Sequence, residues 1–334
     1  MKQLIGPFIL MVLLASCSKE DANLGTKALE SDKPAKMVKS VASLPVTLLD
    51  DSSFQSGFSV LHPTSGSVQG TLQYPGGSGT PVWKLSQWYS QSSLYAATPS
   101  ILGSGSYHYA NSHKAITIGP TSSSDGHIIF AINGENEFSS VYRGASDPFP
   151  HLIVDQRIAE PDGWLGTDTP WLSEMDSLVF NADALLKYHN QNIKSGYDSS
   201  IHALQFSYVF LVQNLNPSNA GYGKNMYFLI MLFDDRYSVP QPFTHADLFS
   251  GNFIYSVGLT PFSQTGLSVG NWKNVGGDLL PMIKNGLNAA WNNGVLTEST
   301  NYGDYKVSLF TMGFECTGMN IGTIQIKNLS LIAK

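Results

Sequence analysis

The sequence predicts an all-β protein built as a large sandwich, jelly roll or barrel. The chain is a succession of short apolar or alternating runs separated by Gly, Pro, Asn and Asp. Turn dipeptides such as Asp125-Gly126 and Asn133-Gly134 lie between these runs. Charged residues make up only 13% of the 334 residues, where about a quarter is usual. This low charge and the frequent turns are typical of secreted β proteins that act on neutral ligands.

The first residues have the order of a secretory signal. Lys2 precedes an apolar run from Leu4 to Leu14, and the segment ends in Leu14-Ala15-Ser16-Cys17. This run is too short to span a bilayer, which takes about 20 apolar residues. The ending resembles the lipobox of bacterial lipoproteins, which implies that Cys17 is lipidated after cleavage. We therefore expect a signal peptide at 1–16 and a membrane-anchored lipoprotein, with an ordinary cleaved signal as the alternative.

The segment after Cys17 is expected to be a flexible tether over residues 17–46, because it is rich in Lys, Ser, Ala and Asp. Its start, Ser18-Lys19-Glu20-Asp21, resembles the export signal of Bacteroidota lipoproteins. That resemblance implies an outer-membrane protein facing the cell exterior; a plain solvated linker is the alternative. Residues 47–334 are expected to form one β-sandwich domain, although the turn-rich stretch Arg143–Pro150 is a conceivable boundary.

The expected strands follow from apolar or alternating runs bounded by turn residues. They lie near Phe54–Leu61, Ser67–Tyr74, Pro81–Tyr89, Lys114–Ile118, His127–Ile132, Glu137–Tyr142, His151–Ile158, Ser177–Tyr188, Ile201–Val212, Asn225–Phe233, Gly251–Val257, Tyr305–Glu315 and Ile321–Ile332.

One helix is predicted near the C-terminus. Asp278 can cap it and Gly294 can end it, with apolar residues at helical spacing between them. Pro281 falls in the first turn, where its missing N–H has no partner to lose.

Two kinds of strand stand out. Asn225–Phe233 is apolar on both faces and therefore needs a layer above and below it. In the run from His151 to Ile158, by contrast, His151, Asp155 and Arg157 share one face, and Leu152, Val154 and Ile158 share the other. The sequence thus predicts one strand with a half-polar surface.

The C-terminal strands carry a second resemblance. The run from Tyr305 to Gly318, followed by Ile324 to Leu331, is similar in rhythm to the last strands of concanavalin A-like jelly rolls. Carbohydrate-binding modules and polysaccharide-degrading enzymes use that architecture. The resemblance implies two curved antiparallel sheets, one with a concave face that meets a glycan.

Aromatic side chains are the expected glycan-binding groups, because sugars stack on aromatic rings. We expect Trp83 in the core and Trp88, Trp164 and Trp171 at a glycan site, although each could plug an end of the sandwich. Asp235, within Asp234-Asp235-Arg236, is a further candidate. That tripeptide is interpreted as a site rim, a calcium ligand pair or a turn.

For catalysis by a glycosidase, two carboxylates must flank the scissile bond. We expect Asp155 and Glu315 in this role, although Asp155 could simply pair with Arg157. Glu135 and Glu137 beside Asn133-Gly134 are interpreted as a solvated hairpin, and Glu174 and Asp176 as a surface edge. The Glu-x-Asp-x-x-Glu pattern of jelly-roll glucanases is not present.

Elimination by a polysaccharide lyase is the alternative chemistry, with His151 as base and Arg157 neutralising a uronate. The Arg-Glu-Leu-Arg and Gln-Ile-His signals of jelly-roll alginate lyases are missing. No cofactor is expected: calcium is conceivable without a ligand motif, and His245-Ala246-Asp247 lacks a second histidine for zinc.

The sequence therefore predicts a surface lipoprotein whose partner is a polysaccharide or oligosaccharide. Its alternatives are a glycoside hydrolase or lyase on the same scaffold and a structural or adhesive surface protein. Nucleic acid is not an expected partner, because the net charge is −6 and there is no basic run beyond the first forty residues. Cys316 is expected to be a buried small hydrophobe without a disulfide partner.

Overall fold

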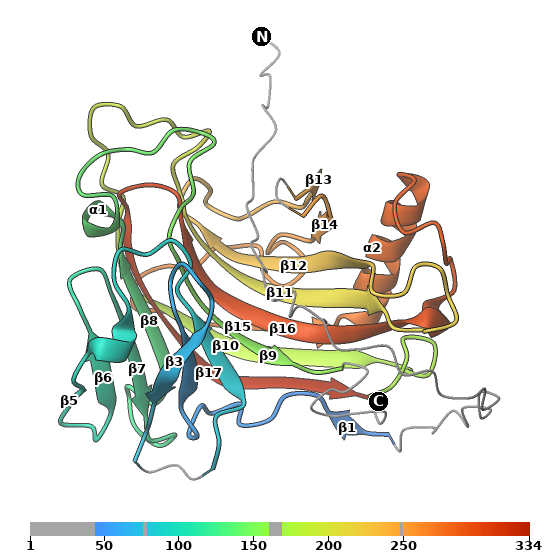
Figure 1. Ribbon diagram of the computed structural model, residues 1–334, viewed down its shortest axis with the longest axis horizontal. Coiled ribbons are helices and arrows are strands. Elements are labelled where there is room, and N and C mark those ends of the chain that lie inside the picture. The colour runs from blue at the N-terminus through green and yellow to red at the C-terminus, as the bar shows by residue number, and fades with distance from the viewer. Residues whose placement is uncertain (1–43, 76–78, 160–168, 248–249) are drawn as a thin grey trace, which may run out of the picture.

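The computed structural model describes residues 44–75, 79–159, 169–247 and 250–334, which form two sheets packed face to face (Figure 1). Cys17, Trp164 and nearly all of the expected tether lie outside these residues. The predicted all-β sandwich is confirmed. None of the helices in the described ranges is long and apolar enough to cross a membrane.

Sheet A has eight strands. Its order is β15 (Trp272–Asp278), β10 (Leu178–Asn190), β17 (Ile321–Ala333), β8 (His127–Asn133), β7 (Lys114–Gly119), β6 (Tyr107–Ala110) and β5 (Ser100–Ile101), and β1 (Val46–Thr47) pairs with β17. β1 therefore begins at the last residue of the expected tether.

Sheet B has nine strands. Its order is β13 (Phe243–Ala246), β14 (Phe253–Ser256), β12 (Asn225–Asp234), β11 (Leu204–Asn214), β16 (Tyr305–Cys316), β9 (His151–Arg157), β4 (Trp83–Ser86), β2 (Phe58–Leu61) and β3 (Val68–Leu72). Strand pairs are antiparallel except β12 with β14 and β2 with β4. The sheet continues across Arg143–Pro150, because β9, which follows this stretch, pairs with β4, which precedes it.

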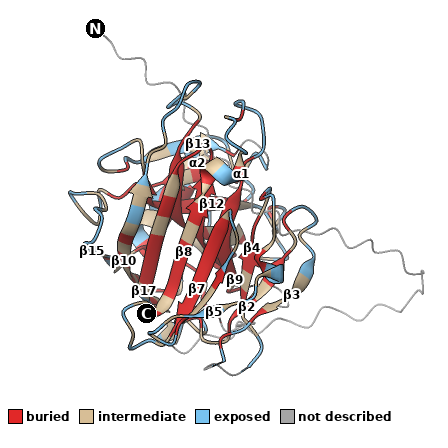
Figure 2. Cartoon of the chain, turned by 90° about the vertical axis from the view of Figure 1, so that its left-hand side faces the viewer, coloured by how far each residue is buried: buried red, intermediate tan, exposed pale blue. Residues whose placement is uncertain are grey.

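The core lies between the two sheets and is rich in aromatic rings. Phe180 of β10 packs edge-on against Tyr208 and Phe210 of β11, with ring centroids 5.1 and 5.4 Å apart. Trp83 is fully buried, as expected, and its indole N–H donates to the carbonyl of Asp51. Figure 2 shows the same pattern, with buried residues running along the strands. Burying each such ring contributes about 1.5–3 kcal/mol.

The predicted helix is confirmed as α2 (Leu280–Asn292). The Asp278 carboxylate accepts the N–H of Leu280, so it caps the first turn although Leu279 is the N-cap residue. The buried face of α2 packs on β12 and β14: a Cβ on Gly286 would lie 2.9 Å from Cε of Met226. The helix thus covers the inner face of β12, and the outward apolar residues of this strand, Tyr227, Leu229 and Met231, belong to a second buried cluster.

The hairpin expected at Asn133-Gly134 and the strand expected at Glu137–Tyr142 are wrong. The Asn133 side chain instead accepts the N–H of Asn136 and caps the short helix α1 (Gly134–Glu137). Glu137 is buried beside Lys114, with Nζ and Oε1 3.5 Å apart. Glu137 therefore belongs to a buried ion pair and not to the expected solvated hairpin. Two short 3-10 helices, η1 (Leu94–Ala96) and η3 (Tyr302–Asp304), lie in the connections between strands.

Candidate functional site

The outer face of sheet B, which points away from the core, carries the polar side chains predicted on β9. Leu152 and Val154 are core residues, so strand alternation places His151, Asp155 and Arg157 on the outer face. The predicted half-polar strand is thus present. It lies beside β16, whose Glu315 also faces outward because Phe314 and Cys316 belong to the core.

Four polar side chains form a continuous row across this face. Glu315 is paired in register with His151 on one side and with Gln205 on the other. Gln205 donates from Nε2 to Oδ2 of Asp234, at 2.8 Å. Asp234 in turn binds the guanidinium of Arg236 through both carboxylate oxygens. We call His151, Glu315, Gln205 and Asp234 the polar row.

Several buried polar atoms near the row have no hydrogen-bond partner among the described residues. They include Oε2 of Glu315, Oγ1 of Thr311 and Oδ1 of Asp247. These three residues are only 5%, 3% and 2% exposed. Buried polar atoms are almost always hydrogen-bonded to protein or to ordered water. Glu315 and Thr311 share the outer face of β16. Water or the polar groups of a ligand can supply the missing hydrogen bonds on this face.

Burial changes the protonation of the two carboxyl groups expected on this face. It raises the pKa of Glu315 well above its usual value, and the negative charge of Asp247 raises it further. Burial also raises the pKa of Asp155 to about 6, although Lys84, the Ser86 hydroxyl and Arg157 oppose this shift. Glu315 therefore keeps its proton at a pH where an exposed glutamate has lost it, and can donate a hydrogen bond.

The expected carboxylates do not form a pair at glycosidase distance. Asp155 is in register with Thr311, four residues from Glu315 along β16. At about 3.4 Å per residue and about 4.8 Å between strands, the two positions are roughly 14 Å apart. Glycosidase carboxylates are separated by at most about 9.5 Å. The carboxylate whose charge reaches Glu315 is Asp247, in the turn after β13.

The lyase groups are also separated. His151 and Arg157 occupy the two ends of β9, six residues and about 20 Å apart. One sugar unit cannot contact both side chains. Their shared face is confirmed, but the spacing does not suit a base and a cation that act on the same uronate.

Aromatic side chains stand beside the polar row. The ring of His151 stacks on Phe149, with centroids 4.7 Å apart, and lies 6.5 Å from the ring of Tyr89. Tyr89 is 43% exposed and has a φ of +56°, an uncommon conformation for a tyrosine. Tyr89 belongs to the same aromatic run as Trp88, the residue of this run that was expected at the glycan site. Trp88 is half-buried under Gly66, and its carbonyl accepts the N–H of His151.

Trp171 and Asp235, the other two described residues expected at a glycan site, are not members of the polar row. Trp171 is half-buried, and Nζ of Lys306 lies 4.4 Å from its ring centre. The carboxylate of Asp235 is fully buried and accepts hydrogen bonds from the Leu204 N–H and the Asn320 amide. Asp235 therefore links the start of β11 to the residue that precedes β17 through hydrogen bonds.

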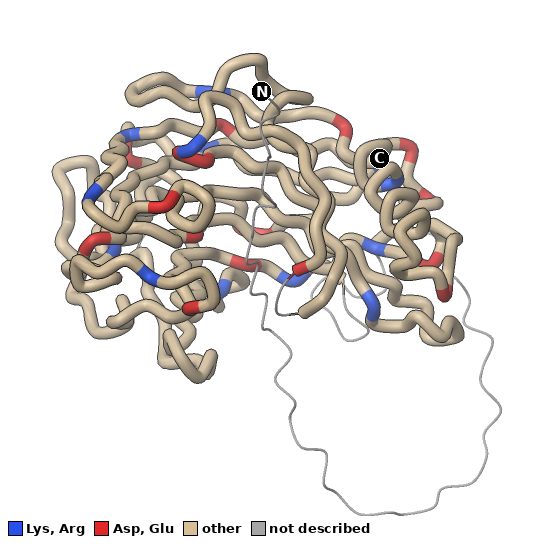
Figure 3. The backbone as a smooth tube through the Cα atoms, turned by 90° about the horizontal axis from the view of Figure 1, so that it is seen from above, with Lys and Arg blue, Asp and Glu red and all other residues tan. Residues whose placement is uncertain are grey.

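The remaining candidate carboxylates have structural partners. Glu174 accepts the N–H of Trp171, and Glu135 accepts from the Asn192 amide. No group of three or more His, Cys, Asp or Glu within the described ranges is placed to hold a metal ion. Cys316 is fully buried in the core, as expected. Basic and acidic residues lie interspersed around the molecule (Figure 3).

Comparison with known proteins gives similarity in structure only. No protein-family profile matches the sequence, and no curated protein matches it. A family 12 xyloglucanase from Bacillus licheniformis is 13% identical, with a TM-score of 0.40, over 71% of this chain and 97% of its own.

Two further solved structures show the same level of similarity. Endoglucanase cel12A from Rhodothermus marinus is 12% identical, with a TM-score of 0.36 and coverage of 71% and 96%. The xyloglucanase domain of NopAA from Sinorhizobium fredii, in complex with cellobiose, is 12% identical, with a TM-score of 0.33 and coverage of 70% and 100%. At these values the similarity concerns the course of the strands and assigns no activity.

Proposed function

We propose that this protein binds a polysaccharide across the outer face of sheet B. The observation that carries the proposal is a set of buried polar atoms with no hydrogen-bond partner among the described residues, Oε2 of Glu315 foremost, on a face that carries amide and carboxyl groups. Such groups read the hydroxyls of a sugar, and leaving them without a partner costs about 1–3 kcal/mol each. A neutral glycan supplies those hydroxyls without bringing a charge into the site.

The aromatic rim supports the same ligand class. Tyr89 exposes an apolar ring beside the stacked His151 and Phe149, and sugar C–H faces pack on such rings. The polar row and this rim lie together at the start of β9. The ligand is therefore expected to meet hydroxyl-binding and ring-stacking groups at the same end of the face.

Affinity electrophoresis and calorimetry against a panel of neutral and acidic polysaccharides test the proposal. Binding by the wild type that weakens at least tenfold in Gln205→Ala, a member of the polar row, supports it. The matched control is Glu298→Gln, whose exposed carboxylate pairs with Lys224 away from the polar row. If no polysaccharide in the panel is retarded or bound, the proposal fails.

Hydrolysis of the glycan is a second candidate, favoured by one observation. Burial and the charge of Asp247 keep Glu315 protonated, and a glycosidase needs one protonated and one ionised carboxyl group. In this candidate Glu315 donates the proton to the leaving sugar. Asp247 is the partner carboxylate.

New reducing ends released from a bound polysaccharide would establish this second candidate. Activity lost in both Glu315→Gln and Asp247→Asn, with binding retained, assigns the two roles. Binding without any release of reducing ends leaves the protein a binding protein. Activity that survives both substitutions rejects these residues.

The proposed setting is the bacterial cell surface, with the chain held through lipidated Cys17. The support is the sequence from Leu14 to Cys17. Metabolic labelling with a palmitate analogue and a Cys17→Ser variant tests this part. Label that persists in the variant overturns it.

A further inference from the structure

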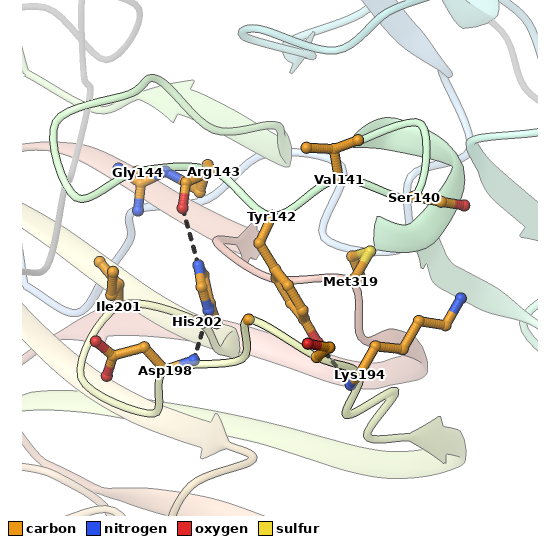
Figure 4. A pocket seen from close by; sticks show the side chains of 12 residues that line it. Ser140, Val141, Tyr142, Arg143, Gly144, Lys194, Asp198, Ile201, His202 and Met319 are labelled. Atoms are coloured by element: carbon orange, nitrogen blue, oxygen red, sulfur yellow. Dashed lines mark hydrogen bonds between the residues drawn. The ribbon is translucent and has the colours of Figure 1, made fainter.

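A pocket of about 680 Å³ lies at one end of the sandwich, where three loops meet (Figure 4). The loop after α1 contributes residues 140–144, the loop between β10 and β11 contributes residues from 194 to 202, and Met319 comes from the β16–β17 turn. Pockets for small molecules usually measure about 300–1,000 Å³. None of the polar-row residues lines this pocket.

A stacked pair of rings forms the wall of the pocket. The rings of Tyr142 and His202 lie 4.4 Å apart at 23°, and the ring of Tyr197 meets Tyr142 edge-on at 6.1 Å. Figure 4 shows Tyr142 between His202 on one side and Lys194 and Met319 on the other. An aromatic wall of this kind suits the apolar face of a sugar ring.

Hydrogen bonds hold both rings of this wall in place. The N–H of Asp198 donates to Nδ1 of His202, at 2.9 Å, and Nε2 of His202 donates to the carbonyl of Arg143, at 3.0 Å. The Tyr142 hydroxyl donates to the carbonyl of Asn192 and accepts the N–H of Lys194. The wall is thus ordered before a ligand arrives, which lowers the entropic cost of binding.

The charged side chains at the pocket already have protein partners. Lys194 pairs with Glu135, and the Arg143 guanidinium donates to the carbonyls of Ala145 and Asp147. Asp198 accepts from the N–H and the hydroxyl of Ser200. A phosphate or another strongly charged ligand would therefore have to break existing ion pairs or hydrogen bonds. A neutral polyhydroxylated ligand needs no such exchange.

We propose that this pocket is a second carbohydrate-binding site, which takes one or two neutral sugar units. Its lining shares no residue with the polar row, and the proposal does not depend on the polysaccharide binding proposed there. The sugar stacks on the Tyr142–His202 wall, and its hydroxyls meet the polar groups of the loop at residues 194–198.

Ligand-observed NMR and calorimetry on the full-length protein test this site with short probes. The probes are glucose, galactose, mannose, xylose and their β-linked disaccharides. Ser195→Trp places a large ring in the pocket, while Ser199→Trp adds the same ring in the same loop outside the pocket lining. Both serines are exposed, so neither change disturbs the core.

We expect at least one probe to bind, with affinity reduced tenfold or more by Ser195→Trp and unchanged by Ser199→Trp. Glu315→Gln should leave this binding unchanged, which separates the pocket from the polar row. Failure of every probe to bind overturns the proposal. Binding that survives Ser195→Trp, or that is lost only in Glu315→Gln, also overturns it.

Discussion

Glu315 and His151 face each other across the antiparallel ladder between β16 and β9. Both are almost fully buried, and both lie on the face of sheet B that points away from the core. A carboxyl group with a raised pKa and an imidazole thus occupy neighbouring positions, with the exposed ring of Tyr89 close by.

Glu315→Gln is expected to flatten the pH dependence of stability. The folded-state pKa of Glu315 is raised, so the folded state holds a proton that the unfolded chain has released above about pH 4.3. Stability from this group is therefore fully present below that pH and falls as pH rises. Urea unfolding between pH 4 and pH 8 should show a smaller loss in the variant. Glu298→Gln is the exposed control, and a wild-type profile in Glu315→Gln would contradict the prediction.

Asp155→Asn is expected to act in the same direction over a narrower range. With a folded pKa of about 6 against a usual 3.8, the group loses stability between about pH 4 and pH 6. The loss is at most about 3 kcal/mol, at 1.36 kcal/mol per pKa unit. In the variant Lys84 and Arg157 lose a charged neighbour, so the stability that the substitution restores at pH 7 should be smaller than this maximum. Chemical denaturation of wild type and variant at pH 4 and pH 7 measures the difference in stability. Equal differences at the two pH values would argue against this assignment.

The buried pair of Lys114 and Glu137 should be sensitive to removal of one partner. Both side chains are fully buried, and burial lowers the pKa of Lys114. Lys114→Met leaves the buried carboxylate of Glu137 without its ion-pair partner and should lower the free energy of unfolding by about 3–5 kcal/mol. The double variant Lys114→Met/Glu137→Gln should recover much of that loss. A double-mutant cycle by thermal unfolding checks the coupling, and additive effects would refute it.

Gly313→Ala is expected to destabilise the contact between β16 and β9. A Cβ at Gly313 would lie 2.2 Å from the carbonyl oxygen of Leu152, and the φ of +150° disfavours a side chain. We expect a loss of about 1–3 kcal/mol, as for other overpacked sites. Gly103→Ala is the matched control, because a Cβ there meets nothing within 4 Å. Equal melting temperatures for the two variants would contradict the expectation.

The half-polar strand β9 could be predicted because alternation is local. His151, Asp155 and Arg157 are separated by even numbers of residues on one strand, so alternation alone places them on the same face. Glu315 could be chosen as a candidate on similar local grounds, because it lies late in a predicted strand. The distance between Asp155 and Glu315 depends instead on the register of β9 with β16. That register joins segments more than 150 residues apart, and no local pattern specifies it.

The neighbours of Glu315 in the folded chain could not be predicted for the same reason. Gln205 becomes its neighbour through the pairing of β11 with β16, and Asp247 approaches through the tertiary course of the chain after β13. In the sequence, Asp247 stood out only as one residue of a poor metal motif. The misread turn at Asn133 has a local cause: an Asn side chain can cap a helix as readily as it can occupy a hairpin.

The pairing of β1 with β17 brings the two ends of the described domain together. Val46 is in register with Ala333, one residue before the C-terminal Lys334 (Figure 1). A short linker could therefore join the two ends in a circularly permuted chain with new ends in an exposed loop. An affinity tag added after Lys334 would lie beside the point where the preceding segment enters the sandwich. A tag that must stay clear of that segment is better placed in a loop at the opposite end of β17.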